Sequence, residues 1–206
     1  MYLRPVFTET DDARIQGLIE ANPFGLLITH SPDGIEASHI PFLLTRTAGG
    51  FVLSGHLAAG NAQCSQLDGH AALAVFGGPH AYISPGWYAV QPAVPTWDYA
   101  AVHVAGTLTP VTDAAEVAQD LQGLAAGDPN GFSVAAMPPD YRGRMFAGIR
   151  AFTLTPRTVQ AQWKMSQNRS QTDREQVVVG LRAQPDAGSR DTAALIEATL
   201  PGRGLR

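Results

Sequence analysis

The chain of 206 residues is 45% hydrophobic and 16% charged, with a formal net charge of −4 at pH 7. This balance is typical of a globular protein and excludes a disordered chain, while the acidic charge argues against a surface that grips nucleic acid throughout. The single cysteine, Cys64, excludes an intrachain disulfide and a cysteine-based zinc cluster. No apolar leader opens the chain and no apolar run approaches the ~18 residues that span a bilayer, so we expect a cytoplasmic protein without membrane contact.

The first half of the chain is predicted to hold helices and a series of short strands. Capping side chains at 10–12 predict a first helix that stops at Asn22-Pro23. Short Asp/Gly turns at 31–34 and 47–50 join segments of β-type sequence, which predicts antiparallel neighbours. Strands are expected at 24–30, 35–45, 51–56, 71–76 and 80–84, with a further helix at 57–67.

The second half begins with a long predicted strand, 99–111, in which imperfect alternation of apolar residues suggests a bend or bulge near Gly106. A later strand, 149–163, is expected to turn or lie at an edge in its middle, because Pro156 cannot donate a ladder hydrogen bond. Thr172 and Glu175 form a capping-box pattern. Helices are expected at 113–125, 138–147, 172–184 and 189–200.

Six or more closely connected strands interrupted by single helices favour a mainly β, α+β fold, an antiparallel and Greek-key-like barrel with helices packed outside. No linker is long enough to separate two domains. Residues 1–206 are therefore interpreted as a single domain, with the C-terminal helices at about 172–200 packed as an appendage. No strand is followed by GxGxxG, which argues against a dinucleotide-binding doubly wound fold.

A first candidate for binding chemistry is the segment 53–61, LSGHLAAGN. The predicted strand there gives way to a helix within a few residues. Free backbone N–H groups at a helix start, beside Ser54, His56 and Asn61, would suit a phosphate. An ordinary strand-to-helix turn is the alternative interpretation.

A second candidate is the segment 162–168, QWKMSQN, which contains Lys164, the only lysine of the chain. A lysine ammonium is a compact charge with rotating donors, and it would suit a phosphate or a polarisable ring atom. The polar residues that follow add neutral donors and acceptors. A solvated loop is the alternative.

Aromatic residues gather in two further segments, 78–88 (GPHAYISPGWY) and 94–103 (VPTWDYAAVH). Prolines fix the backbone there, so the rings stand on rigid supports. Such rings suit stacking on a planar ligand or filling a subunit interface, and the alternative is an aromatic core beneath loops. The six histidines are dispersed without an HxxxH or HxH pair, so no metal site is expected.

Together these segments resemble the PaiB-like proteins, the FMN-binding negative transcriptional regulators of bacteria. The motifs MYLRPVF, SHIPFLL, FGGPHAYISPGWY, VPTWDYAAVH and KMSQNRSQTDREQVVVGL occur in the family's order over essentially the whole chain. The resemblance implies an FMN-binding split β-barrel related to the pyridoxamine-phosphate oxidases. It also implies a homodimer in which FMN lies in the cleft between the two subunits.

The resemblance further assigns roles to individual residues. It implies three groups of cofactor-binding residues. The first lies on a strand beside the isoalloxazine edge, the second surrounds the ribityl phosphate, and the third comes from the partner subunit and closes the site. In that order, the implied cofactor-binding residues are His39, Ile40 and Pro41; Ser54, Gly55, His56 and Asn61; and Lys164, Ser166, Gln167 and Asn168. The residues implied at the ring face or the interface are Tyr82, Trp87, Trp97 and His103.

Two departures from the family's usual sequence bear on the cofactor. Ala59 and Ala62 stand where the family has an arginine and a proline, and Asp98 stands where an asparagine is usual. Losing a cation beside the phosphate is expected to weaken FMN binding by about 1–3 kcal/mol, the scale of a charge-assisted hydrogen bond. An added carboxylate near a dianionic phosphate would weaken it further.

The leading interpretation is therefore a dimeric FMN-binding protein that acts as a negative transcriptional regulator. A flavin-dependent oxidoreductase acting on a small molecule is the first alternative, with His80 or His103 as acid or base, so enzyme activity stays open. A relative that has lost its flavin is the second. Direct DNA binding is disfavoured, because the spare helices at 172–184 and 189–200 carry few cations.

Overall fold

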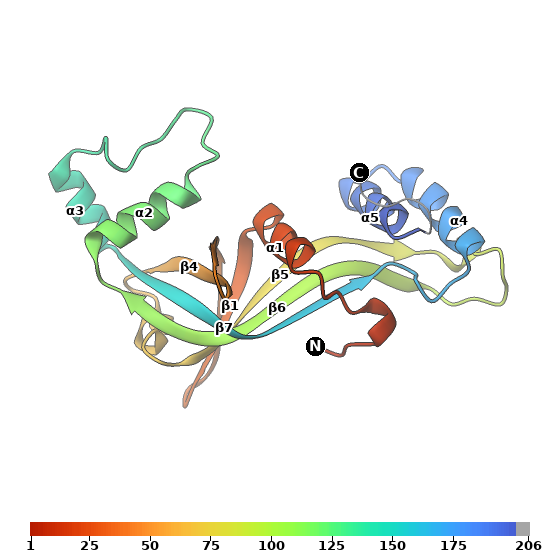
Figure 1. Ribbon diagram of the computed structural model, residues 1–206, viewed down its shortest axis with the longest axis horizontal. Coiled ribbons are helices and arrows are strands. Elements are labelled where there is room, and N and C mark those ends of the chain that lie inside the picture. Colours follow the sequence, from red (N-terminus) through yellow and green to blue (C-terminus); the bar gives the residue numbers. More distant parts are fainter. Residues whose placement is uncertain (201–206) are drawn as a thin grey trace. The chain divides into compact units, whose positions relative to one another are not determined.

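The computed structural model describes residues 1–200, and the chain divides into two compact units. The first unit holds residues 1–15, 77–102 and the chain from Gln160 onward, and the second holds residues 16–76 and 103–159. Three long strands contribute residues to both units, as the ribbon in Figure 1 allows the reader to follow. They are β5 (Ala71–Ile83), β6 (Thr96–Val111) and β7 (Ile149–Lys164).

The strands form an antiparallel, seven-stranded sheet in the order β2-β1-β5-β6-β7-β4-β3. Its other members are β1 (Phe24–Ser31), β2 (Gly34–Pro41), β3 (Leu43–Thr47) and β4 (Gly50–Ala58). Two tight hairpins pair β1 with β2 and β3 with β4. Gly34 and Gly50 open β2 and β4 with φ values of 133° and 127°, a conformation that side-chain-bearing residues rarely adopt.

The core of the second unit is aromatic and aliphatic. Phe42 meets the ring of Phe76 edge-on at 5.2 Å and that of Phe152 at 6.4 Å. Phe42 also separates β2 from β3, and its N–H donates to the carbonyl of Pro23 at 2.8 Å. The single strand expected over 35–45 is therefore two strands, because Phe42 leaves the ladder to bury its ring.

The prediction of a helix over 57–67 is wrong. Strand β4 continues to Ala58, and only a short 3₁₀ helix, η2 (Ala62–Gln66), follows. Buried Gln63 and Gln66 donate their amides to the Thr29 hydroxyl at 2.9 Å and to the Glu36 carboxylate at 3.0 Å. These bonds to distant strands hold the segment in a tighter conformation than its local sequence pattern predicts.

The long strands are more continuous than predicted. The segments 71–76 and 80–84 belong to one strand, β5, and no break interrupts β6 at Gly106. Burial alternates along β6 from Asp98 to Leu108 with Gly106 on the buried side, where a Cβ would lie 2.2 Å from the carbonyl oxygen of Thr155. Gly106 therefore allows the backbones of β6 and β7 to approach closely, and it does not mark a bulge.

Strand β7 also runs through Pro156 without a turn. The last residue of β7 that pairs with β4 is Leu154, so the missing N–H of Pro156 breaks no hydrogen bond to that strand. The three helices predicted at 10–22, 113–125 and 138–147 are confirmed as α1 (Asp12–Ala21), α2 (Ala114–Leu124) and α3 (Pro139–Ala147). Asp113 caps α2 by accepting hydrogen bonds from the N–H groups of Ala115 and Glu116.

In the first unit, two C-terminal helices are present as predicted, α4 (Gln171–Arg182) and α5 (Ala187–Ala198). The cap of α4 is Ser170, whose hydroxyl accepts from the N–H of Asp173 at 3.1 Å, and not the predicted Thr172–Glu175 box. Buried Asp173 in turn accepts from the N–H groups of Ala89 and Val90 at 2.7 and 3.2 Å. This carboxylate anchors the loop after η3 (Pro85–Trp87) to α4.

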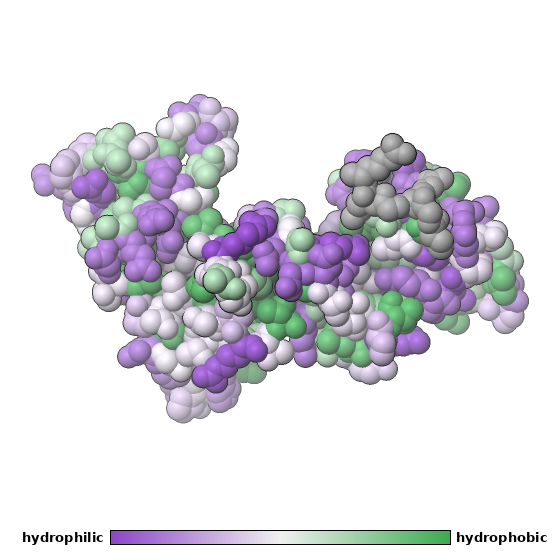
Figure 2. Space-filling model, viewed as in Figure 1, coloured by the Kyte–Doolittle hydropathy of each residue, from purple (hydrophilic) through white to green (hydrophobic). Residues whose placement is uncertain are grey.

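Large apolar side chains also remain on the surface. On the face drawn in Figure 2, hydrophobic residues appear in patches among hydrophilic ones. In the first unit the exposed large apolar residues include Trp97 at 55% and Tyr82 at 48% exposure. Scattered apolar residues are ordinary on a protein surface, whereas neighbouring aromatic rings mark a candidate contact surface.

Candidate functional site

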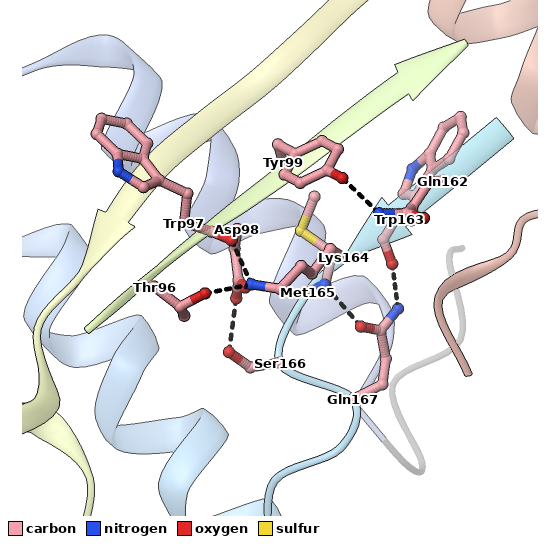
Figure 3. A network of polar contacts seen from close by, with 10 residues as sticks. All are labelled: Thr96, Trp97, Asp98, Tyr99, Gln162, Trp163, Lys164, Met165, Ser166 and Gln167. Carbon is pink, nitrogen blue, oxygen red and sulfur yellow. Dashed lines mark hydrogen bonds and ion pairs between the residues drawn. The ribbon is translucent and has the colours of Figure 1, made fainter. Parts of the chain in front are cut away.

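A buried carboxylate organises the polar residues of the first unit. Asp98, on β6, is fully buried, and its Oδ2 accepts a hydrogen bond from the hydroxyl of Ser166 at 2.6 Å. Its Oδ1 lies 3.3 Å from the Nζ of Lys164, at the end of β7. Figure 3 shows these side chains converging on Asp98. Burial raises the pKa of Asp98, and the Ser166 hydrogen bond and the Lys164 charge oppose that rise.

The Lys164 ammonium is held by more than the ion pair. It donates to the hydroxyl of Thr96 at 2.6 Å and to the carbonyl of Trp97. A lysine has three N–H donors, so the two oxygens and the Asp98 carboxylate use its whole capacity. The lone lysine of the chain therefore serves first to fix the start of β6 against the end of β7.

The residues after Lys164 are committed to the same network. Ser166 adopts a φ of 55°, uncommon for a residue with a side chain, and its hydroxyl bond to Asp98 holds it there. Gln167 accepts from the N–H of Met165 at 2.6 Å and donates to the carbonyl of Trp163, closing the turn (Figure 3). Asn168 is exposed. Segment 162–168 was predicted to present hydrogen-bond donors to a ligand. Most of these groups are instead hydrogen-bonded to other residues of the protein.

The predicted ring-face residues of the first unit separate into two groups. Tyr82 and Trp97 meet edge-on with centroids 6.1 Å apart, and His80 lies 6.2 Å from Trp97, which gives an exposed aromatic cluster. Trp87 instead packs on α4, where a Cβ added to Gly180 would lie 2.4 Å from its indole. Helix packing therefore already accounts for Trp87.

A cavity of about 410 Å³ in this unit was not anticipated from the sequence. The N-terminal segment Met1–Phe7 contributes to its walls, together with Trp97, Tyr99, Gln162 and Lys164. Gln162 is buried, and its Nε2 lies 2.5 Å from the hydroxyl of Tyr99. Tyr99 and Gln162 carry no sequence signal, because a tyrosine and a glutamine within β-type segments are ordinary residues.

In the second unit, the predicted phosphate residues lie along β4. Ser54 and His56 project to the same side of the strand, as residues two apart do. The Ser54 hydroxyl is buried. It lies beside Asp120 on α2: burial raises the pKa of that carboxyl, and the Ser54 hydroxyl opposes the rise. Burial also lowers the pKa of the His56 imidazole, which favours its neutral form.

Asn61 joins the end of β4 to the strand that carries His39. Its Nδ2 donates to the hydroxyl of Ser38 at 2.9 Å, and its Oδ1 accepts from the N–H of Gln63 at 2.9 Å. A Cβ added to Gly55 would lie 3.3 Å from Ile40 Cδ1 and 3.4 Å from the carbonyl oxygen of Pro41. The structure thus brings together the two second-unit groups that the sequence proposed for FMN.

Two further predicted residues of this unit are half-exposed or exposed. His39 is exposed and stacks on Phe24 with ring centroids 6.0 Å apart. His103, on β6, is partly buried, and this burial lowers its pKa. Within residues 1–200, no His, Cys, Asp and Glu side chains gather as a metal site, and no helix is long and apolar enough to cross a membrane.

The fold is the split β-barrel, which confirms the predicted fold class. The conserved hypothetical protein Rv2991 from Mycobacterium tuberculosis aligns with a TM-score of 0.59 at 12% identity, covering 82% of this chain and 92% of that one. The flavocytochrome Anf3 from Azotobacter vinelandii aligns with a TM-score of 0.59 at 10% identity, covering 79% and 72%. At these identities the likeness concerns the fold alone.

The sequence itself defines the family. Residues 1–158 match the family described as "Putative FMN-binding domain". The protein "Protease synthase and sporulation protein PAI 2" of Bacillus subtilis is 30% identical over 205 residues, which cover 97% of this chain and 98% of that protein. An uncharacterised protein of Emericella nidulans is 31% identical over 225 residues, covering 87% and 90%. The chain therefore belongs to the PaiB-like, FMN-binding family, as the sequence motifs predicted, and FMN is the cofactor of that family.

Proposed function

We propose that the protein is a homodimeric flavoprotein whose second unit holds the FMN phosphate beside the C-terminal half of β4. The observation that supports this most is the grouping of the predicted phosphate residues: Ser54 and His56 lie on one side of β4, and Asn61, just after the strand, donates to the hydroxyl of Ser38 on β2. A hydroxyl and an imidazole side by side can both donate to an acceptor-rich phosphate. Family membership supplies the identity of the ligand.

The neighbouring residues fit the phosphate chemically, with two features that limit affinity. Burial lowers the pKa of His56 and so favours the neutral imidazole, which has one N–H to donate, while Asn61 fixes the loop through Ser38 and Gln63. Ala59 supplies no cation, and Asp120 places a carboxyl close to Ser54. Bound FMN would supply one- and two-electron redox chemistry, and the chain's own part is to bind and orient it.

In the first unit we propose a positioning role for the Asp98 network. Lys164 donates to the carbonyl of Trp97, which fixes the backbone that carries the exposed indole. In Figure 3 the Trp97 ring points away from the network, so the network holds this residue without covering it. We assign Trp97 and Tyr82 to a ligand ring or to the second subunit, on the strength of their exposed, edge-on aromatic pair.

We also propose that a role as negative regulator does not depend on α4 or α5 entering a DNA groove. The cations of these helices are already engaged. Arg174 is buried and donates to Ile196 and Thr199, Arg182 pairs with Glu197 at 2.6 Å, and Arg190 donates to the carbonyl of Pro185. A helix that reads DNA presents free cations to phosphates, so regulation would act through the flavin or through a protein partner.

The experiment compares FMN with riboflavin, which lacks the phosphate, by quenching of flavin fluorescence. The wild type is expected to bind FMN more tightly than riboflavin. The variant Ser54→Ala is expected to lose about tenfold in FMN affinity and little in riboflavin affinity. Ser65→Ala, the same change at an exposed hydroxyl of η2, serves as the matched control. Equal affinity of the wild type for the two flavins would overturn the phosphate assignment, and sedimentation of the FMN-loaded protein tests the dimer.

A flavin-dependent reaction on a small molecule is the second candidate. The exposed aromatic cluster of His80, Tyr82 and Trp97 favours it, because flat rings suit a planar substrate. Oxidation of NADH or NADPH by the FMN-loaded protein, with oxygen or a quinone as acceptor, would support it. A bound flavin that neither nicotinamide reduces would count against it.

A further inference from the structure

A second cavity, of about 300 Å³, lies in the second unit. Its walls come from the end of β6, the start of β7, the first turns of α2 and the end of α3, and Figure 1 shows both helices at these strand ends. The volume is at the lower end of the range of small-molecule pockets. None of the residues that the sequence assigned to FMN is among the described residues that line it.

Most of the cavity wall is apolar and incompletely covered. Val117 and Ala151 are buried, at 8% and 7% exposure, whereas Val111, Phe146 and Ile149 are only half-buried. Helix α3, which carries Phe146, has no buried residue along its length. A surface helix normally buries an apolar stripe, so an apolar group in this cavity would supply contacts that α3 lacks.

One cation stands at this apolar cavity. Arg150 is exposed, and its Nη1 donates to the carbonyls of Ala147 and Ile149 at 3.2 and 2.8 Å, which fixes the guanidinium. A guanidinium has five N–H donors, so the edge formed by Nε and Nη2 remains available. No carboxylate of residues 1–200 forms an ion pair with Arg150. The cation is therefore oriented by the backbone and has no counter-charge.

From these observations we propose that the cavity binds a small organic monocarboxylate, with the carboxylate on Arg150 and an apolar body against α2 and α3. The Nε–Nη2 edge matches a carboxylate in bidentate geometry. Arg150 is the one charged residue among those that line the cavity, so it balances a single negative charge. Asp113 does not line it, and its carboxylate caps α2 by accepting from the N–H groups of Ala115 and Glu116.

This proposal does not rest on FMN binding, and its test uses the full-length protein with matched probes. Octanoate carries an aliphatic chain and benzoate an aromatic ring, and octanol and benzyl alcohol are their uncharged counterparts. Binding is followed by saturation-transfer NMR. Arg150→Gln removes the cation, and Arg157→Gln, at an exposed position of the same strand, is its control. Ala114→Trp fills the cavity, and Ala115→Trp, the next exposed residue of α2, is the control for that change.

We expect at least one carboxylate to bind more tightly than its alcohol, and the better carboxylate tells whether the natural body is a chain or a ring. Its affinity should fall about tenfold in Arg150→Gln, stay unchanged in Arg157→Gln, and be lost in Ala114→Trp but not in Ala115→Trp. The alcohols should not respond to Arg150→Gln.

Three results would overturn the proposal. They are failure of both carboxylates to bind, binding that is insensitive to Arg150 and Ala114, and displacement of the carboxylate by FMN, which would assign Arg150 to the flavin phosphate. Carboxylate binding that persists in the presence of saturating FMN supports a separate site. All of these outcomes can be told apart from the FMN–riboflavin comparison, which does not involve Arg150.

Discussion

The hydroxyl of Ser166 donates to the carboxylate of Asp98 at 2.6 Å, across 68 residues of chain. This hydrogen bond gives Asp98 a structural role that the sequence alone does not reveal. In the sequence, Asp98 replaces the asparagine that is usual in the family, and its carboxylate would be expected to repel an anionic ligand. As structure, it is a fully buried acceptor for Ser166 and Lys164, and it fixes the turn that follows β7.

The Asp98 network predicts a pH dependence of stability. Burial holds the pKa of Asp98 above its ordinary value of 3.8 in the folded protein. Between that value and the raised pKa the folded state binds more protons than the unfolded state, so this residue's contribution to stability falls as pH rises. Asp98→Asn does not titrate. The unfolding free energy of the wild type minus that of Asp98→Asn should therefore decrease with rising pH in urea titrations.

Asp68→Asn, on an exposed loop, is the control for the Asp98 experiment. A wild-type-minus-variant difference that stays constant or increases with pH for Asp98→Asn would contradict the assignment. At neutral pH the variant is expected to lose about 1–3 kcal/mol, because the partly buried Lys164 loses its counter-charge.

Restoring a cation after β4 should strengthen FMN binding. Ala59 is held by a hydrogen bond from its N–H to the carbonyl of Gly148 at 2.9 Å, so the backbone at this position is fixed. Ala59→Arg should gain about 1–3 kcal/mol for FMN, or roughly 5- to 150-fold, and much less for riboflavin. Ala62→Arg, at an exposed residue of the adjacent 3₁₀ helix, tests the added charge alone. Equal gains from the two variants would place the phosphate elsewhere.

The packing of Trp87 on α4 gives a prediction of opposite sign at two helical glycines. A Cβ at Gly180 would lie 2.4 Å from the Trp87 ring, whereas a Cβ at Gly17 of α1 would meet nothing within 4 Å. Gly180→Ala should lower the free energy of unfolding by about 1–3 kcal/mol through overpacking. Gly17→Ala should raise it by about 0.5–1 kcal/mol through reduced chain entropy. Thermal melts of the two variants decide the matter, and a stabilising Gly180→Ala would mean that Trp87 does not lie there.

The elements predicted correctly are those that local sequence specifies. Asp113 begins α2 by capping it, and Gly34 and Gly50 sit at the starts of β2 and β4 after tight turns. The errors fall where distant residues decide. Gln63 holds 62–66 in a 3₁₀ turn through a bond to Thr29, 34 residues away. No local pattern contains that bond.

The candidate site follows the same rule. The uniqueness of Lys164 was visible in the sequence, but its partners Thr96 and Asp98 lie more than 60 residues earlier, and only the pairing of strand ends brings them to it. The unpaired amide of Gln162 was invisible, because an unsatisfied atom is a property of the folded surroundings and not of the residue type.

The absorption spectrum of protein purified without added flavin tests the central claim most directly. We predict a yellow protein with flavin bands, which on denaturation releases FMN, one for each chain, and no riboflavin. Colourless protein that also takes up no added FMN would contradict it, because the residues on β4 would then lack the ligand proposed for them.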